Sequence, residues 1–239
     1  MMTRQSLSPK SKAIVKPLIL IPALLLLFAA VACESDPSPE ANTTAKVTIE
    51  ELRPLLNSER IERKFGSYGI DVLRNDDAVR MSNLYSLRDG EKICRTFAVV
   101  LFPDELDPTI AAEHKMISGG QSIGAVFKEN GWSVTKYSKY FGLMAVTPRL
   151  RGVLELMGNI NPLGLAVYMY DLEVKKGNVS APYATISEFY HPGFLKIEAL
   201  EKIYGEEFRT NLKPDSLTQQ TLGVVMTELA KAAPVTAVK

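Results

Sequence analysis

Residues 93–102 read ICRTFAVVLF, and every side chain from Phe97 onward is apolar. A strand points alternate side chains to opposite faces of its sheet, so an unbroken apolar run indicates that both faces are buried. This stretch therefore predicts a strand that runs through the centre of a sheet.

Further strands are expected on both sides of this central strand in the sequence. Two strong turn compositions, Asn75-Asp76-Asp77 and Arg88-Asp89-Gly90, separate three apolar segments and indicate an antiparallel meander. A hairpin about Lys176-Gly177-Asn178 is expected nearer the C-terminus. The predicted strands span residues 67–74, 78–86, 91–103, 132–146, 164–174 and 179–190.

Helices are expected between and after these blocks of strands. Thr48 to Glu51 is a capping box that starts the first helical segment, and Gly66 is expected to end it. The predicted helical segments are 48–65, a principal helix from Asp107 to the stop at Asn130-Gly131, a short helix from Thr147-Pro148 to Gly158, 194–204 ended by Gly205, and 216–231 with a capping box from Ser216 to Gln219. Because strands and helices come in blocks, we predict an α+β fold, an antiparallel sheet covered by helices.

The N-terminus has the composition of an export signal. Residues 1–16 hold four basic residues and no acidic residue, and residues 17–32, PLILIPALLLLFAAVA, are apolar. At about 1.5 Å per residue this segment makes roughly 24 Å of helix, shorter than the roughly 30 Å hydrocarbon core of a bilayer. The basic residues precede it and acidic residues follow it, which favours export of the rest of the chain.

Ala30-Val31-Ala32-Cys33 resembles the lipobox of bacterial lipoproteins. The resemblance covers residues 1–33 only, and Ala30 stands where leucine is commoner. It implies that Cys33 is lipidated and becomes the new N-terminus. Glu34 differs from the Asp that commonly signals inner-membrane retention, so the outer membrane is favoured if the cell has two. The alternatives are ordinary cleavage after Ala32 and an uncleaved anchor helix.

This interpretation divides the chain into three parts. Residues 1–32 are the signal peptide, residues 33–46 the lipidated cysteine with a polar flexible tether, and residues 47–239 a single domain. The composition, 46% hydrophobic with 2 Cys, excludes a disulfide scaffold and wholesale disorder. Removing the four leader cations from 28 basic residues leaves 24 against 27 acidic residues, so we expect no nucleic-acid partner.

One segment fits a catalytic motif. Gly120-Gln121-Ser122-Ile123-Gly124 matches G-x-S-x-G, the nucleophile elbow of α/β-hydrolases, and Asp171 and His191 follow in the triad order. The histidine would take the serine proton and the aspartate would orient its ring. A helix is expected before Ser122 where an elbow needs a buried strand, so we favour glycines that bend the helix or let it approach the sheet.

Other reactive groups give weaker patterns. No phosphate-binding loop and no metal-binding motif occurs, and we expect no cofactor and no metal. The candidate metal ligands would be His114, His191, Glu113, Glu188 and Asp77. Cys94 could pair with His114 as a nucleophile, but its place in the central strand favours an unreactive buried thiol.

Aromatic side chains are the remaining candidates for a binding surface. They could line a groove for a peptide, glycan or lipid, although strand aromatics more often pack in a core. The set is Trp132, Tyr137, Tyr140, Phe141, Tyr168, Tyr170, Tyr183, Phe189 and Tyr190. We expect a lipid-anchored envelope protein that binds a protein or small ligand without catalysis. The alternatives are a serine hydrolase using Ser122 and His191, and a structural subunit of an envelope assembly.

Overall fold

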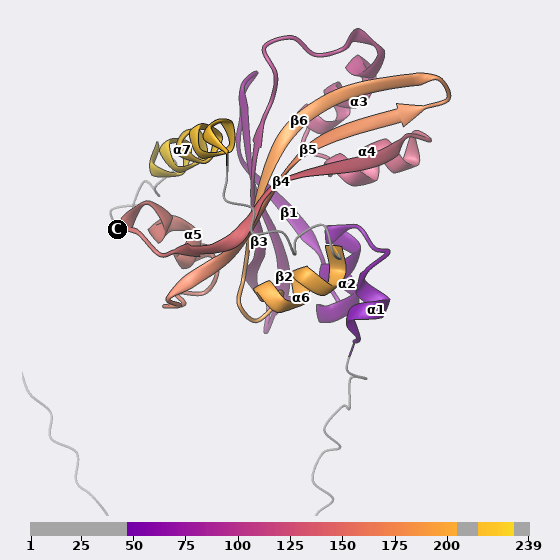
Figure 1. The fold of residues 1–239 in the computed structure, drawn as a ribbon. Helices are drawn as coiled ribbons and strands as arrows, with labels where there is room; N and C mark the ends of the chain where they lie inside the picture. The colour runs from indigo at the N-terminus through magenta and orange to yellow at the C-terminus, as the bar shows by residue number, and fades with distance from the viewer. Residues whose placement is uncertain (1–46, 205–214, 232–239) are drawn as a thin grey trace, which may run out of the picture. The chain divides into compact units, whose positions relative to one another are not determined.

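The computed structural model describes residues 47–204 and 215–231, and these form an α+β fold (Figure 1). Its sheet has six antiparallel strands in the order β1-β2-β3-β6-β5-β4. The strand β3 (Glu91–Leu101) lies between β2 and β6 in the middle of the sheet. The predicted fold class and the predicted central strand are both confirmed.

The strands form two blocks that meet at β3 and β6. The first block is the predicted meander of β1 (Gly69–Asn75), β2 (Val79–Arg88) and β3. The second contains β4 (Ser133–Ala145) and the predicted hairpin of β5 (Gly164–Lys176) and β6 (Val179–Tyr190). Because β3 pairs with β6, side chains that are about 90 residues apart in the sequence become neighbours.

Short helices surround the sheet. The helix α1 (Ile49–Leu52) begins at the predicted capping box, where Thr48 and Glu51 exchange both hydrogen bonds. The helix α2 (Asn57–Phe65) ends at Gly66, whose φ of 74° is one that glycine adopts without strain. The remaining helices are α3 (Ala111–Ser118), α4 (Ile123–Glu129), α5 (Arg151–Leu156), α6 (Ile197–Tyr204) and α7 (Ser216–Lys231).

The predicted principal helix is wrong, because residues 107–130 form two helices rather than one. The chain leaves α3 at Gly119 and turns at Gly120, whose φ is +105°. The guanidinium of Arg80, from β2, donates hydrogen bonds to the carbonyl oxygens of Ile117 and Gln121 and so holds the turn. The two glycines weaken the helix here, and a distant arginine stabilises the break.

The start of α7 also differs from the prediction. Asp215 accepts a hydrogen bond from the backbone N–H of Thr218 at 2.7 Å, so Asp215 is the capping residue rather than Ser216. The predicted stop at Gly205 lies outside the described residues.

The helices divide the buried side chains into two clusters, one on each face of the sheet. On what we call the cavity face, Ala98 and Val100 of β3 point toward α1, α2, α3, α4 and α6. On the apolar face, Phe97 and Val99 of the same strand pack against α5 and α7. Figure 1 shows α5 and α7 on one side of the sheet and the other helices on the opposite side.

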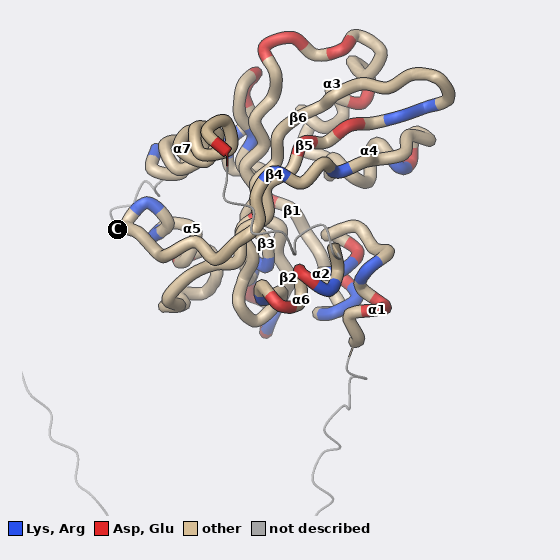
Figure 2. Tube along the Cα trace, in the orientation of Figure 1, with Lys and Arg blue, Asp and Glu red and all other residues tan. Residues whose placement is uncertain are grey.

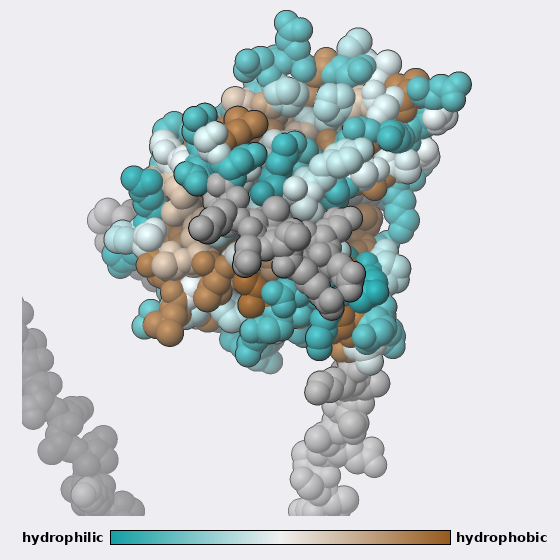
Figure 3. Space-filling view, in the orientation of Figure 1, coloured by the Kyte–Doolittle hydropathy of each residue, from teal (hydrophilic) through white to brown (hydrophobic). Residues whose placement is uncertain are grey.

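Acidic and basic residues are interspersed along the described parts of the chain (Figure 2). The space-filling view is largely hydrophilic, with an apolar area near α5 (Figure 3). The most exposed large apolar side chain is Leu163, at 95%. In the described part of the chain, no helix has both the length and the apolar character needed to cross a bilayer.

Candidate functional site

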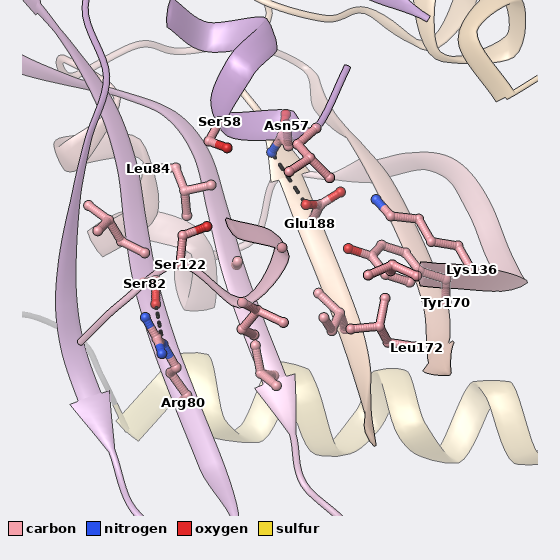
Figure 4. A pocket seen from close by; sticks show the side chains of 18 residues that line it. Asn57, Ser58, Arg80, Ser82, Leu84, Ser122, Lys136, Tyr170, Leu172 and Glu188 are labelled. Atoms are coloured by element: carbon pink, nitrogen blue, oxygen red, sulfur yellow. Dashed lines mark hydrogen bonds between the residues drawn. The ribbon is translucent and has the colours of Figure 1, made fainter. Parts of the chain in front are cut away.

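A cavity of about 90 Å³ lies on the cavity face, between α2 and the start of α4 (Figure 4). All six strands, β1 to β6, contribute residues to its lining. Its walls are largely apolar, and the apolar lining residues are Leu56, Ile70, Leu84, Ala98, Val100, Ile123, Val134, Leu172 and Ile186. Its polar lining residues come from different elements, so the fold brings them together.

The cavity exists because small side chains face its middle. Ser82 on β2 is in register with Ala98 on β3, and Ala98 is in register with Glu188 on β6. The side chains of Ser82 and Ala98 are too short to reach the helices above them. At the roof, a Cβ on Gly124 would lie 3.3 Å from Leu56 Cδ2, so this glycine lets α4 approach the start of α2 closely.

Glu188 is the acidic group of the site and is only 5% exposed. Its Oε1 accepts a hydrogen bond from Asn57 Nδ2 at 3.3 Å, and its Oε2 accepts one from the Tyr190 hydroxyl. Burial and the neighbouring Glu188 charge raise the pKa of Tyr190 well above its ordinary value. Tyr190 therefore stays protonated and keeps donating to the carboxylate. The Asn57 Oδ1 atom is buried and has no hydrogen-bond partner among the residues that the structure describes.

Lys136 is the basic group at the opposite wall (Figure 4). Its Nζ lies 4.2 Å from the ring centroid of Tyr170, 5.5 Å from that of Tyr204 and 5.8 Å from that of Tyr168. Such contacts stabilise an ammonium group. Burial lowers the pKa of Lys136, but Tyr204, Glu188 and Tyr168 more than offset it, and the net shift is upward. Lys136 is therefore charged at neutral pH.

Two buried arginines adjoin the site. Arg80 is 1% exposed and donates to Ser82 Oγ at 3.1 Å in addition to the carbonyl oxygens of the α3–α4 turn. Burial lowers its pKa. Arg60, on α2, donates to the Tyr204 hydroxyl at 2.8 Å and to the carbonyl oxygen of Leu52 at 2.8 Å. Both guanidinium groups therefore bind neutral acceptors, and neither contacts a carboxylate of the described residues directly.

The structure does not bring the predicted triad together. Ser122 lines the cavity, but Asp171 lies between Tyr170 and Leu172 on β5 and points to the opposite face. There its carboxylate contacts Lys139 Nζ at 2.8 Å and Thr185 Oγ1 at 2.7 Å.

His191 is held in a turn after β6, where its Nδ1 accepts a hydrogen bond from the Gly193 backbone N–H at 2.8 Å. It interacts with the backbone of Met157, at the end of α5 on the apolar face. The sheet thus separates the acid from Ser122, and the imidazole lies in the turn after β6, outside the lining of the cavity that contains Ser122.

The other reactive groups are also placed apart. Cys94 is fully buried in the apolar-face cluster, and burial raises the pKa of its thiol. His114 contacts the Tyr183 hydroxyl at 3.1 Å and Ser118 Oγ at 3.3 Å, so it forms no dyad with Cys94. Glu113 accepts a hydrogen bond from Trp132 Nε1 at 2.8 Å. Within residues 47–204 and 215–231, no group of three or more His, Cys, Asp or Glu is placed to hold a metal ion.

Most of the predicted aromatic set packs in the core. The buried members are Trp132, Tyr168, Tyr170, Tyr183, Phe189 and Tyr190. Tyr170 is the member that lines the cavity. The sequence did carry a signal for the site, because Glu188 alternates with Ile186 and Tyr190 at positions of an apolar strand face. A charged residue in phase with buried positions predicts a functional or structural polar site.

We compared the sequence with protein-family models and with curated proteins. No protein-family model matches the sequence, and no curated protein matches it.

Proposed function

We propose that this chain is a lipid-anchored protein of the bacterial cell envelope whose domain binds a small ligand in the cavity and performs no catalysis. The anchor is the acylated thiol of Cys33, and the outer membrane is the favoured location in a cell with two membranes. The leader of residues 1–32 and the small residues before Cys33 support this part of the proposal.

The buried carboxylate of Glu188 and the partly buried ammonium group of Lys136 support the binding function. Removing a carboxylate and an ammonium group from water is costly, and apolar side chains of similar size would stabilise a core at least as well. Here Glu188 and Lys136 instead line a space that the protein leaves unfilled. A cavity with apolar walls and a few convergent polar groups is the arrangement typical of small-molecule sites.

Binding is favoured over hydrolysis because a nucleophilic serine needs a base within hydrogen-bonding reach. The sheet separates Ser122 from Asp171, and His191 lies in the turn after β6 rather than in the cavity lining. His114, the other histidine of the chain, interacts with Tyr183 and Ser118.

The anchor is tested by mass spectrometry of the N-terminal peptide and by labelling cells with radioactive palmitate. We expect the wild-type chain to begin at Cys33, to carry acyl mass and to stay with washed membranes, since two or more acyl chains hold a protein stably at a bilayer. Cys33→Ser is expected to lose both the label and the membrane association. Cys94→Ser is the matched control, and it should keep both. A mature chain that starts elsewhere and carries no acyl group contradicts the anchor.

The binding function is tested on full-length protein purified from its own membranes. Small molecules released on denaturation are compared between the wild type and Ala98→Leu, which fills the cavity from its floor. We expect at least one compound from the wild type that the variant lacks. Identical compounds from both proteins contradict binding in this cavity.

A further inference from the structure

The charge around the cavity is unbalanced. Arg60, Arg80 and Lys136 are cationic, whereas Glu188 is the acidic residue among those that line the cavity. Arg60 interacts electrostatically with both Glu188 and Lys136. The excess of positive charge favours an anionic ligand, because that ligand would neutralise a cation that is partly removed from water.

Lys136 is the cation whose donors remain available. The Nε, Nη1 and Nη2 atoms of Arg80 donate to Ser82 and to backbone carbonyls, and Arg60 is bonded similarly. Lys136 Nζ contacts tyrosine rings, and no hydrogen-bond acceptor or carboxylate within reach of Nζ is found among the described residues. An ammonium group has three N–H donors, so a ligand oxygen at the cavity wall would gain charge-assisted hydrogen bonds.

A cationic ligand is disfavoured by the same geometry. The faces of Tyr168, Tyr170 and Tyr204 already surround the Lys136 ammonium. The Glu188 oxygens already accept hydrogen bonds from Asn57 and Tyr190. A second cation would therefore meet a like charge and a carboxylate that is already engaged.

The size and walls of the cavity limit the rest of the ligand. Its volume of about 90 Å³ is below the 150 Å³ or so that accommodates benzene in an engineered cavity. Leu84, Val100 and Ile186 give the floor an apolar surface away from Lys136. An apolar tail of about three or four carbons suits this space.

From these four features we infer that the ligand is a short-chain carboxylate, bound with its carboxylate at Lys136 Nζ and its tail against the β2, β3 and β6 floor. This inference rests on the proposed binding function and names the ligand class for the same cavity.

The test compares three probes of similar shape: butyrate, butyramide and butylammonium. Each is titrated into the full-length chain in non-ionic detergent micelles, and binding is followed by saturation-transfer NMR and calorimetry. We expect butyrate to bind at least about tenfold more tightly than butyramide, a difference of about 1.4 kcal/mol, since a hydrogen bond to a charged group is stronger than a neutral one. Butylammonium is expected to bind most weakly.

Matched variants locate the carboxylate. Lys136→Met is expected to reduce butyrate affinity to that of butyramide and to leave butyramide affinity unchanged. Lys139→Met is the control on the same strand, because Lys139 pairs with Asp171 on the other face and should not affect either probe. Fluorescence of Trp132, the one tryptophan of the chain, confirms that each variant is folded. The ranking of the three probes on the wild type is independent of any variant.

The outcomes separate this inference from the proposed function. Binding of butyramide or butylammonium at least as tight as that of butyrate, lost in Ala98→Leu, overturns the carboxylate and leaves the binding cavity in place. Butyrate affinity unchanged by Lys136→Met overturns the role of Lys136. No binding of any of the three probes to the wild type overturns the inference, and then the comparison of compounds released by the wild type and Ala98→Leu decides the binding function separately.

Discussion

The two faces of one sheet differ in what they bury. On the apolar face, α5 and α7 cover a cluster of apolar side chains that includes Phe97, Val99 and Phe189. Glu228 of α7, which is 8% exposed, forms an ion pair with Arg74. The cavity face buries Glu188, arginines and tyrosines around an unfilled space. The difference indicates that one face supplies stability, whereas the other carries polar groups at a cost in stability.

The largest expected loss of stability comes from removing a large buried side chain on the apolar face. Phe189 is fully buried. Phe189→Ala should lower the free energy of unfolding by about 3–5 kcal/mol, because apolar burial is lost and a cavity remains. Denaturant unfolding of the full-length chain, followed by Trp132 fluorescence, measures the change. Leu163→Ala is the control, since Leu163 is 95% exposed and its loss should stay within about 0.5 kcal/mol. Equal effects of the two would contradict the packed apolar face.

The second effect concerns the buried carboxylate of the cavity face. Glu188→Ala leaves the donors of Tyr190 and Asn57 without an acceptor and removes a longer-range electrostatic attraction to Lys136, which should cost about 2–4 kcal/mol. Glu188→Gln keeps an acceptor oxygen for one donor and should cost about half as much. Chemical unfolding of both variants measures the difference. If alanine and glutamine are equally destabilising, hydrogen bonding to residue 188 is not what holds this face together.

Local sequence patterns correctly predicted the central strand and several helix ends. The apolar run from Phe97 placed β3 at the centre, and Thr48 and Gly66 marked helix ends where the structure has them. The division of the principal helix depends on Arg80, which lies about 40 residues away from the turn that it binds. A contact between residues so far apart in the sequence cannot be predicted from a local sequence pattern.

The cavity itself follows from strand pairing. Ser82, Ala98 and Glu188 form one row only because β2 pairs with β3 and β3 pairs with β6. The sequence analysis considered Glu188 as a candidate metal ligand. In the structure its carboxylate instead accepts hydrogen bonds from Asn57 of α2 and from Tyr190 of its own strand. The alternation of side chains along a strand does predict that Asp171 and its neighbour Tyr170 point to opposite faces of the sheet. Only the strand order and the packing of the helices determine that Tyr170, and not Asp171, lies on the face of Ser122.

Alkaline pH should weaken the cavity face specifically. Burial raises the pKa of Tyr168 to about 12, whereas an unfolded tyrosine ionises near pH 10. The unfolded chain then releases a proton that the folded chain retains, so this contribution is complete below about pH 10 and is lost as pH rises toward 12. The raised pKa of Lys136 acts in the same direction. Stability measured from pH 8 to pH 11.5 should fall in the upper part of this range.

Tyr168→Phe sharpens this prediction. It should flatten the decline by up to about 1.4 kcal/mol per pH unit and should cost only about 1 kcal/mol at pH 7, through the hydrogen bond between the Tyr168 hydroxyl and Ser138 Oγ. Tyr137→Phe is the control, because the Tyr137 side chain is 45% exposed. A decline that is identical in the wild type and in Tyr168→Phe would exclude Tyr168 as its source.

The smallest expected change in stability is the sharpest test of the comparison, because it uses adjacent residues of β3. Ala98→Leu adds carbons that enter the cavity, so apolar burial is gained without displacing neighbours and the free energy of unfolding should change by less than about 1 kcal/mol. Val99→Phe enlarges the next side chain, which points to the apolar face and is fully buried. That substitution should destabilise the chain by about 1–3 kcal/mol, because close-packed neighbours must move. Thermal and denaturant unfolding of both variants measure the contrast. If both cost the same, the cavity face is as tightly filled as the apolar face, and no space remains there for a ligand.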